Sequence, residues 1–227
     1  MAVGEEAVQV SVWKRGGPEL AKAAATVCYG DVRDVLAGLP HHHGGNHYML
    51  DDTIFPVRER IIRSLDPQPR SVFEFGALVG YFLVTALHAA PSIERVGWID
   101  NESHTPGSNE LCFANVCSVP RGAKTIGNGR GEARWALSRD AVTWNGFELG
   151  YDLVQVDADH SYPECLADLH AADQLQARWI FVDDWTAEVH AEDVQLATFT
   201  FMAESRSGWG LVEYKTTNGL AVLTREG

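Results

Sequence analysis

Short apolar runs and amphipathic segments alternate along the chain from residue 71 onward. A run of about four to six apolar residues is typical of a buried strand, and apolar residues three or four apart are typical of a helix. The runs predict strands at 72–75, 95–100, 124–126, 152–156, 179–182, 209–214 and 220–224. The amphipathic segments predict helices at 81–89, 110–119 and 162–175, with a further helix starting over 131–137.

Strands that alternate with helices predict an α/β fold in which the strands are parallel. The last two strands are separated by Thr-Thr-Asn-Gly at 216–219, which favours a hairpin turn. The expected architecture is therefore Rossmann-like: a doubly wound, mostly parallel, seven-stranded sheet with an antiparallel C-terminal hairpin. Ligands of such sheets bind at the carboxyl ends of the strands.

The first 66 residues differ in character from the rest and predict a helical N-terminal cap on a core of residues 67–227, within a single domain of residues 1–227. Helices are expected at 19–28 and from Asp51 or Asp52, either of which can cap a helix, to about Leu65. The histidine-rich stretch 41–47 favours a substrate-facing loop. Zinc binding is the alternative, although adjacent histidines do not all point one way.

Composition and charge narrow the classes of partner and the cellular compartment that the chain is expected to have. The net charge of −13 disfavours nucleic acid and anionic membranes as partners, because both need clustered basic residues, and it also simply favours solubility. Cys28, Cys112, Cys117 and Cys165 show neither a C-x-x-C spacing nor a dense framework, so reduced thiols in a cytoplasmic protein are expected. The acidic N-terminus lacks signal-peptide character, and no run of about 18 apolar residues occurs.

A glycine-containing turn follows the first predicted core strand: Glu74-Phe-Gly76-Ala77-Leu-Val-Gly80-Tyr81. Glycines allow a ligand to approach the backbone closely, although ordinary turn chemistry is an alternative interpretation. The spacing differs from the dinucleotide fingerprint Gly-x-Gly-x-x-Gly. A glutamate before the turn would repel a phosphate and suits a cationic ligand. S-adenosylmethionine, which carries a sulfonium and an ammonium, is the better candidate.

Acidic residues follow several predicted strands. Asp100 ends the second strand, where an acid can accept the ribose hydroxyls of a nucleoside or can cap the next helix. Asp157 follows the fourth strand, and Asp183 and Asp184 follow the fifth. Three carboxylates at adjacent strand ends would repel one another, and Mg²⁺ would relieve the repulsion. The alternative is a metal-free site in which these residues cap helices and loops.

The motif around Gly76 and Gly80 resembles the first motif of class I S-adenosylmethionine-dependent methyltransferases, and closely that of the catechol-type O-methyltransferases. The resemblance implies that Glu74, Gly76, Ala77, Gly80 and Tyr81 bind the cofactor, with Glu74 placing its methionine end. That family usually has a serine after the Gly-Tyr pair to hold the methionine carboxylate, whereas this chain has Phe82. Another group must then bind that carboxylate.

The second half of the chain extends the resemblance, which spans roughly residues 70–224. In catechol-type and macrolide-sugar O-methyltransferases, acids like Asp157, Asp183 and Asp184 hold Mg²⁺, and a lysine at the position of His160 acts as general base. The resemblance thus implies His160 and Asp157 as catalytic residues. It also places Asp157 at the cofactor. The stretch Gly131-Glu132-Ala133 resembles the family's turn against adenine.

These features predict a Mg²⁺-assisted O-methyltransferase that acts on a hydroxyl of a small molecule, with His160 as general base and Trp185 as a wall of the acceptor site. A sugar, a phenol and a polyketide all fit as acceptor, and a homo-oligomer is left open. The alternatives are a metal-free N-methyltransferase, a cofactor-assisted cyclase of a natural-product pathway, and a non-catalytic module that binds S-adenosylmethionine.

Overall fold

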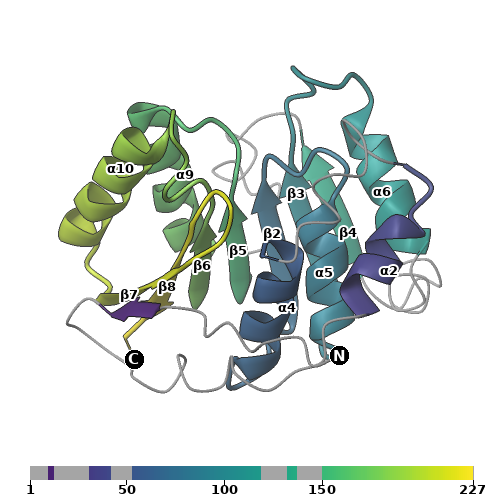
Figure 1. Cartoon of the computed structure of the whole chain (residues 1–227), viewed down its shortest axis with the longest axis horizontal. Helices are drawn as coiled ribbons and strands as arrows, with labels where there is room; N and C mark the ends of the chain where they lie inside the picture. Colours follow the sequence, from purple (N-terminus) through teal and green to yellow (C-terminus); the bar gives the residue numbers. More distant parts are fainter. Residues whose placement is uncertain (1–9, 13–30, 42–52, 119–131, 137–149, 227) are drawn as a thin grey trace, which may run out of the picture.

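A computed structural model of the chain describes residues 10–12, 31–41, 53–118, 132–136 and 150–226 (Figure 1). The strands are β1 (Val10–Val12), β2 (Ser71–Phe75), β3 (Arg95–Ile99), β4 (Glu132–Ala136), β5 (Leu153–Val156), β6 (Trp179–Val182), β7 (Trp209–Tyr214) and β8 (Leu220–Arg225). The helices are α2 (Asp31–Ala37), α4 (Phe55–Ser64), α5 (Tyr81–Ala89), α6 (Ser108–Ser118), α9 (Tyr162–Gln174) and α10 (Ala191–Glu204).

The strands form one sheet in the order β1-β7-β8-β6-β5-β2-β3-β4. The five strands from β6 to β4 are parallel, and β8 joins them antiparallel between β6 and β7. The predicted α/β architecture with an antiparallel C-terminal hairpin is therefore confirmed. One short strand that the sequence did not predict, β1, pairs antiparallel with β7 and adds an eighth strand at the edge.

The order of the strands reverses between β2 and β5. The chain runs from β2 outward through β3 to β4, and then returns to the other side of β2 to form β5 and β6. In open α/β sheets such a reversal leaves a crevice at the carboxyl ends of the two central strands, where ligands bind. The turn after β2 and the loop after β5 meet at this place.

The third core strand differs from the prediction. The helix expected to start over 131–137 is wrong, because residues 132–136 form β4, which pairs in parallel with β3 from Arg95 opposite Glu132 to Ile99 opposite Ala136. Pairing stacks the ring of Trp135 on that of Trp98, with 5.3 Å between their centroids, a contact between distant segments that local periodicity does not reveal. The strand expected at 124–126 lies outside the described residues.

The N-terminal region supplies α2 and α4. The helix expected from Asp51 or Asp52 begins later, at Phe55, and Ile54 precedes it without a side-chain cap. The backbone of His41 is held on α6, since its N–H donates to Asn115 Oδ1 at 3.0 Å and its carbonyl accepts from Asn115 Nδ2 at 2.8 Å. The helix expected at 19–28 and the histidines at 42, 43 and 47 lie outside the described residues.

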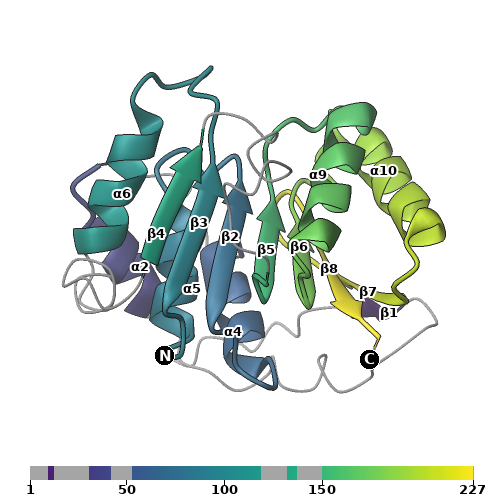
Figure 2. The ribbon, with the colours of Figure 1, turned by 180° about the vertical axis from the view of Figure 1, so that it is seen from behind.

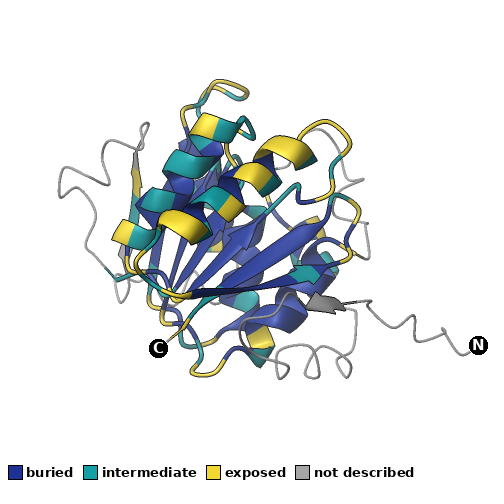
Figure 3. Ribbon diagram, turned by 90° about the vertical axis from the view of Figure 1, so that its left-hand side faces the viewer, coloured by how far each residue is buried: buried dark blue, intermediate teal, exposed yellow. Residues whose placement is uncertain are grey.

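Two helical layers cover the sheet (Figure 2). One hydrophobic cluster joins the sheet to α2, α4, α5 and part of α6, and a second joins the other face to α9 and α10. Figure 3 shows the strands as largely buried, with exposed residues gathered on outer helix surfaces and loops. Within the described ranges, no helix has both the length and the apolar character that crossing a membrane requires.

Alternation along the central strands assigns their residues to these two layers. In β5, Leu153 belongs to the α4 and α5 side and Val154 to the α9 and α10 side. Since neighbouring residues in a strand face opposite ways, Gln155 is directed to the α4 side. The same alternation in β2, from Val72 and Phe73, directs Glu74 to the α4 side. The buried polar residues Glu74 and Gln155 therefore both face α4.

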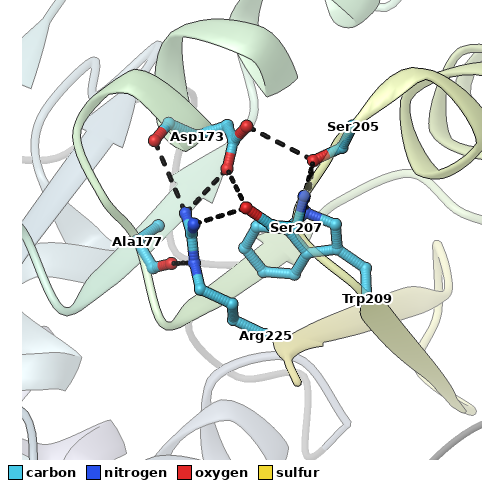
Figure 4. Close-up of polar contacts among 6 residues, drawn as sticks. All are labelled: Asp173, Ala177, Ser205, Ser207, Trp209 and Arg225. Carbon is cyan, nitrogen blue, oxygen red and sulfur yellow. Dashed lines mark hydrogen bonds and ion pairs between the residues drawn. The ribbon is translucent and has the colours of Figure 1, made fainter. Parts of the chain in front are cut away.

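A polar network ties the C-terminal strand to α9 and to the start of β7 (Figure 4). The guanidinium of Arg225 donates to Asp173 Oδ1, to Ser207 Oγ and to the carbonyl of Ala177, each at 2.7 Å. It also lies over the ring of Trp209, 4.8 Å from the centroid. The planar five-donor fork of arginine makes all of these contacts at once, which lysine cannot do.

We expect Arg225→Lys to lower the free energy of unfolding by about 1 to 2 kcal/mol, because several charge-assisted hydrogen bonds are lost together. Urea unfolding followed by circular dichroism measures the change. Arg70→Lys is the matched control, since Arg70 pairs with Glu94 at 3.1 Å on an exposed surface, and exposed pairs contribute only about 0.2–1 kcal/mol. Equal effects of the two substitutions would contradict this account.

Candidate functional site

The turn after β2 is shaped by glycines, as the sequence predicted. Gly76 has φ of +80°, and a Cβ there would lie 2.2 Å from the carbonyl oxygen of Asp157. Gly80 has φ of +78° and precedes α5, and a Cβ there would lie 2.6 Å from Cys112 Sγ. Both positions therefore exclude larger residues, and the turn lies directly against the end of β5.

A cavity of about 170 Å³ opens between this turn, the start of α4 and the ends of β5 and β6. It is smaller than the roughly 300–1,000 Å³ of typical ligand pockets, so it suits one end of a larger ligand. Its lining includes the predicted residues Glu74, Gly76, Ala77, Tyr81, Asp157 and Asp183. Sequence reasoning missed Phe55, Leu78, Val79, Phe82 and Gln155, which line it as well.

Arg58 of α4 is the main site residue that the sequence analysis did not identify. Its side chain is 1% exposed, and its Nη2 lies 2.5 Å from Asp183 Oδ1. Its Nε donates to Gln155 Oε1 at 3.3 Å. A signal was present in the sequence, because Arg58 lies on the apolar stripe of its helix, at helical spacing from Ile54, Phe55 and Ile62. A charged residue in such a stripe indicates a buried partner.

Gln155 connects the arginine to two further carboxyl groups. Its Nε2 donates to Glu74 Oε1 at 3.1 Å and to Asp157 Oδ2 at 2.9 Å. Burial, reinforced by the nearby charge of Asp157, raises the pKa of Glu74 well above its ordinary value. The other oxygen, Glu74 Oε2, is buried and has no hydrogen-bond partner. Burial therefore favours the protonated form of Glu74, and its Oε2 is an unused oxygen among the residues that line the cavity.

His160 lies between two carboxylates. Its Nε2 is 3.4 Å from Asp157 Oδ1 and its Nδ1 is 3.6 Å from Asp184 Oδ2. At these distances the contacts are ion pairs rather than well-formed hydrogen bonds. Burial disfavours the charged imidazole, but the contact with Asp157 and the charges of Asp157, Asp184 and Asp183 together outweigh it and raise the pKa of His160 to about 8. Burial and the nearby Asp183 raise the pKa of Asp157 to about 7.

The three aspartates that the sequence assigned to Mg²⁺ do not meet at one point. Among the described residues, the three potential ligand atoms that lie within 4.8 Å of one another come from His160, Asp184 and His190 instead. Asp183 is already paired with a guanidinium. Mg²⁺ prefers near-octahedral oxygen ligands, and two imidazoles with one carboxylate suit a softer transition ion. The described arrangement therefore does not fit the expected Mg²⁺ site.

Asp100 has a structural role beyond the helix cap that the sequence analysis left open. Its Oδ2 accepts from the N–H of Leu78 at 2.7 Å, and its Oδ1 accepts from the N–H of Glu102 at 2.7 Å and from Ser108 Oγ at 2.8 Å. The side chain thus holds the glycine turn to the loop after β3. It does not line the cavity, and the predicted contact with ribose stays a prediction.

Two other expectations are corrected. The premise that Gly131-Glu132-Ala133 forms a turn after the third strand is wrong. Glu132 and Ala133 begin β4, where they pair with Arg95 and Val96. This is the amino end of the parallel strands, away from the crevice at their carboxyl ends. Residue 131 lies outside the described residues. Trp185 does not wall the site, because it is buried in the core beneath α10 and contacts Phe199 edge to face.

Comparisons with solved structures identify the fold. An O-methyltransferase from Bacillus cereus in complex with SAH has a TM-score of 0.56 and 18% identity over 86% of this chain and 90% of its own. The O-methyltransferase TomG from Streptomyces achromogenes, involved in tomaymycin synthesis and in complex with SAM, has a TM-score of 0.55 and 17% identity over 94% and 92%. Cofactor-bound Rv0187 from MTB has a TM-score of 0.53 and 22% identity over 92% and 90%.

Sequence comparison adds no relative. No protein-family model and no curated protein matches the chain. At these identities the structural likeness concerns the fold. The chain therefore has the Rossmann-like fold of S-adenosylmethionine-dependent O-methyltransferases, as the resemblance of its motifs implied.

We expect His160 to titrate near pH 8 in NMR spectra, above the ordinary histidine value of about 6.5. Asp157→Asn removes the charge that offsets burial, so the pKa of His160 should fall below that of the wild-type chain. Asp34→Asn on the exposed side of α2 is the control and should leave the titration unchanged. A pKa at or below 6.5 in the wild-type chain would contradict the paired geometry.

Proposed function

We propose that this protein is an S-adenosylmethionine-dependent O-methyltransferase that acts on a hydroxyl group of a small molecule. The observation that carries the proposal is the glycine turn, with buried Glu74 in the adjoining cavity and the His160–Asp157 pair at the next strand end. The shared fold of SAH-bound and SAM-bound O-methyltransferases supports it. A sugar, a phenol and a polyketide are all compatible acceptors, and a cytoplasmic location remains a prediction from the cysteine pattern.

Glu74 and Gly76 of the cavity both have a role in this proposal. The unused oxygen of Glu74 would bind the ammonium of the methionine end, and Gly76 would allow the ligand to approach the backbone. The N-terminal N–H groups of α5 would receive the carboxylate, which the family's serine would otherwise bind and which Phe82 cannot. When bound, S-adenosylmethionine supplies an electrophilic methyl group on its sulfonium.

His160 is the candidate general base. In its neutral form it would accept the proton of the acceptor hydroxyl, and the carboxylates of Asp157 and Asp184 would stabilise the imidazolium that forms. Because the pKa of His160 is raised to about 8, the neutral base becomes more abundant as the pH rises through that value. No step in this proposal passes through Mg²⁺, since the described carboxylates do not fit that ion.

Binding of the ligand's ammonium should release a proton. Burial favours the protonated form of Glu74 in the free protein by raising its pKa, and a cation placed beside it lowers that pKa. We expect calorimetry with S-adenosylhomocysteine near neutral pH, in two buffers of different ionisation enthalpy, to detect net proton release and tighter binding as the pH rises.

Two substitutions test where that proton comes from. Glu74→Gln should abolish the release, whereas Glu94→Gln, on the exposed pair with Arg70, should behave as the wild-type chain does. The role of Glu74 is wrong if the wild-type chain binds S-adenosylhomocysteine and both variants release the same number of protons as it does.

Mass spectrometry tests the activity directly. The chain is incubated with S-adenosylmethionine and a panel of sugars, phenols and polyketides, and one accepted compound should gain a single methyl group on oxygen. With that compound, His160→Ala should lower kcat by roughly 10²- to 10⁴-fold, the usual contribution of a general base. His170→Ala, whose side chain pairs with Glu204 on α10, is the control and should retain full activity.

The other outcomes separate the alternatives. A product methylated on nitrogen would indicate an N-methyltransferase, and a rearranged product of unchanged mass would indicate a cyclase. If the protein binds neither S-adenosylmethionine nor S-adenosylhomocysteine, the proposal as a whole is wrong. Equal rates for His160→Ala and the wild-type chain would remove His160 from the mechanism alone.

A further inference from the structure

We propose that Arg58 takes the place of a divalent cation at the carboxylates that follow β5 and β6, so that Asp157 and Asp183 need no metal ion between them. The inference concerns how these buried charges are compensated. It depends on neither the acceptor nor the methyl donor, and its test therefore fails or succeeds separately from that of the proposed function.

The position of Arg58 is the first support. Its guanidinium reaches from α4 to Asp183 at the end of β6, with the two side chains 1% and 14% exposed and 2.5 Å between Nη2 and Oδ1. A guanidinium is charged at every accessible pH and forms close contacts with carboxylates. A buried charge pair is costly to break, because removal of one partner leaves the other uncompensated. The pair therefore keeps Asp183 from serving as a free ligand.

The contacts of Gln155 extend the influence of the arginine to Asp157. Arg58 Nε donates to the side-chain oxygen of Gln155, whose amide group in turn donates to Asp157 Oδ2 and to Glu74 Oε1. The guanidinium also lies over the ring of Phe55, 5.6 Å from its centroid. The permanent positive charge of Arg58 thus contacts one carboxylate directly and two further carboxyl groups through Gln155, all on the α4 side of the site.

The backbone after β6 explains why the third aspartate is separate. Asp183 and Asp184 are neighbours in the chain, but both follow Val182, the last residue of the strand, so strand alternation does not set their directions. Asp183 contacts Arg58 on the α4 side, whereas Asp184 lies 3.6 Å from His160 and groups with His190. The backbone of Asp184 also has φ of +54°, which turns the chain sharply at this point. Asp183 is therefore held by Arg58 and Asp184 lies beside His160, while Asp157 contacts both Gln155 and His160.

Manganese provides a direct probe, because Mn²⁺ binds oxygen ligands as Mg²⁺ does and its free form is measured by electron paramagnetic resonance. We expect the wild-type chain to show no Mn²⁺ binding that depends on Asp183. Arg58→Met should create such binding by freeing the carboxylates, with affinity increased on the order of ten-fold or more. Arg58→Lys keeps the positive charge and should not create it.

Two controls assign the bound ion. Asp183→Asn added to Arg58→Met should abolish the new binding. His190→Ala, examined alone, removes any binding by the group of His160, Asp184 and His190. Thermal unfolding checks that each variant is folded, and Mn²⁺ should raise the Tm of Arg58→Met without affecting that of Arg58→Lys.

The wild-type titration decides the proposal even if Arg58→Met does not fold. Mn²⁺ binding that persists in His190→Ala and disappears in Asp183→Asn would overturn it, because the aspartates would then bind a metal with Arg58 in place. Absence of binding that depends on Asp183 in the wild-type chain supports it.

Discussion

The ion pair between Arg58 and Asp183 reduces the charge repulsion among the acidic residues of the site. The carboxyl ends of β2, β5 and β6 bring buried Glu74 and the partly buried Asp157 and Asp183 to the lining of one cavity. Two like charges 4 Å apart repel by about 4 kcal/mol at an effective dielectric constant of 20, which is a large part of the stability of a typical domain. Arg58 offsets this repulsion at Asp183, and the raised pKa of Glu74 removes a second charge by protonation.

Because Arg58 belongs to α4, the compensation of these negative charges connects α4 to the strand ends of the sheet. Phe55 lines the cavity and Arg58 holds the strand ends, so α4 contributes to the site rather than only covering it. The glycine turn allows the backbone after β2 to lie directly against the backbone of Asp157, because Gly76 has no side chain. The site is therefore assembled from three strand ends and one helix, each fixed by burial on the same face of the sheet.

The sequence predicted the elements whose pattern is local. The segments at 81–89, 179–182 and 209–214 form α5, β6 and β7 with the predicted bounds. The glycine turn was recognised because glycine with positive φ leaves a direct signature in the sequence. Strand β4 was missed because its short sequence, Glu-Ala-Arg-Trp-Ala, forms a strand by pairing with the distant β3, and no local pattern encodes that pairing.

Several residues that line the cavity were named from the sequence, but their arrangement was not predicted. Asp157 and His160 do form a pair, as their spacing suggested. The expected cage of three aspartates assumed that adjacent residues share a direction, whereas Asp183 contacts Arg58 and Asp184 lies beside His160. Arg58 comes from a helix nearly 100 residues before Asp157 in the chain. Such a contact depends on how α4 packs against the sheet, and a single sequence does not specify it.

A crystal structure of the protein with S-adenosylhomocysteine, grown in the presence of Mn²⁺, tests the account most directly. The account predicts the ligand's methionine end beside Glu74 in the glycine turn, Arg58 still on Asp183, and no anomalous manganese signal among Asp157, Asp183 and Asp184. An ion held by those three aspartates with the guanidinium displaced, or a ligand bound away from the turn, would contradict it.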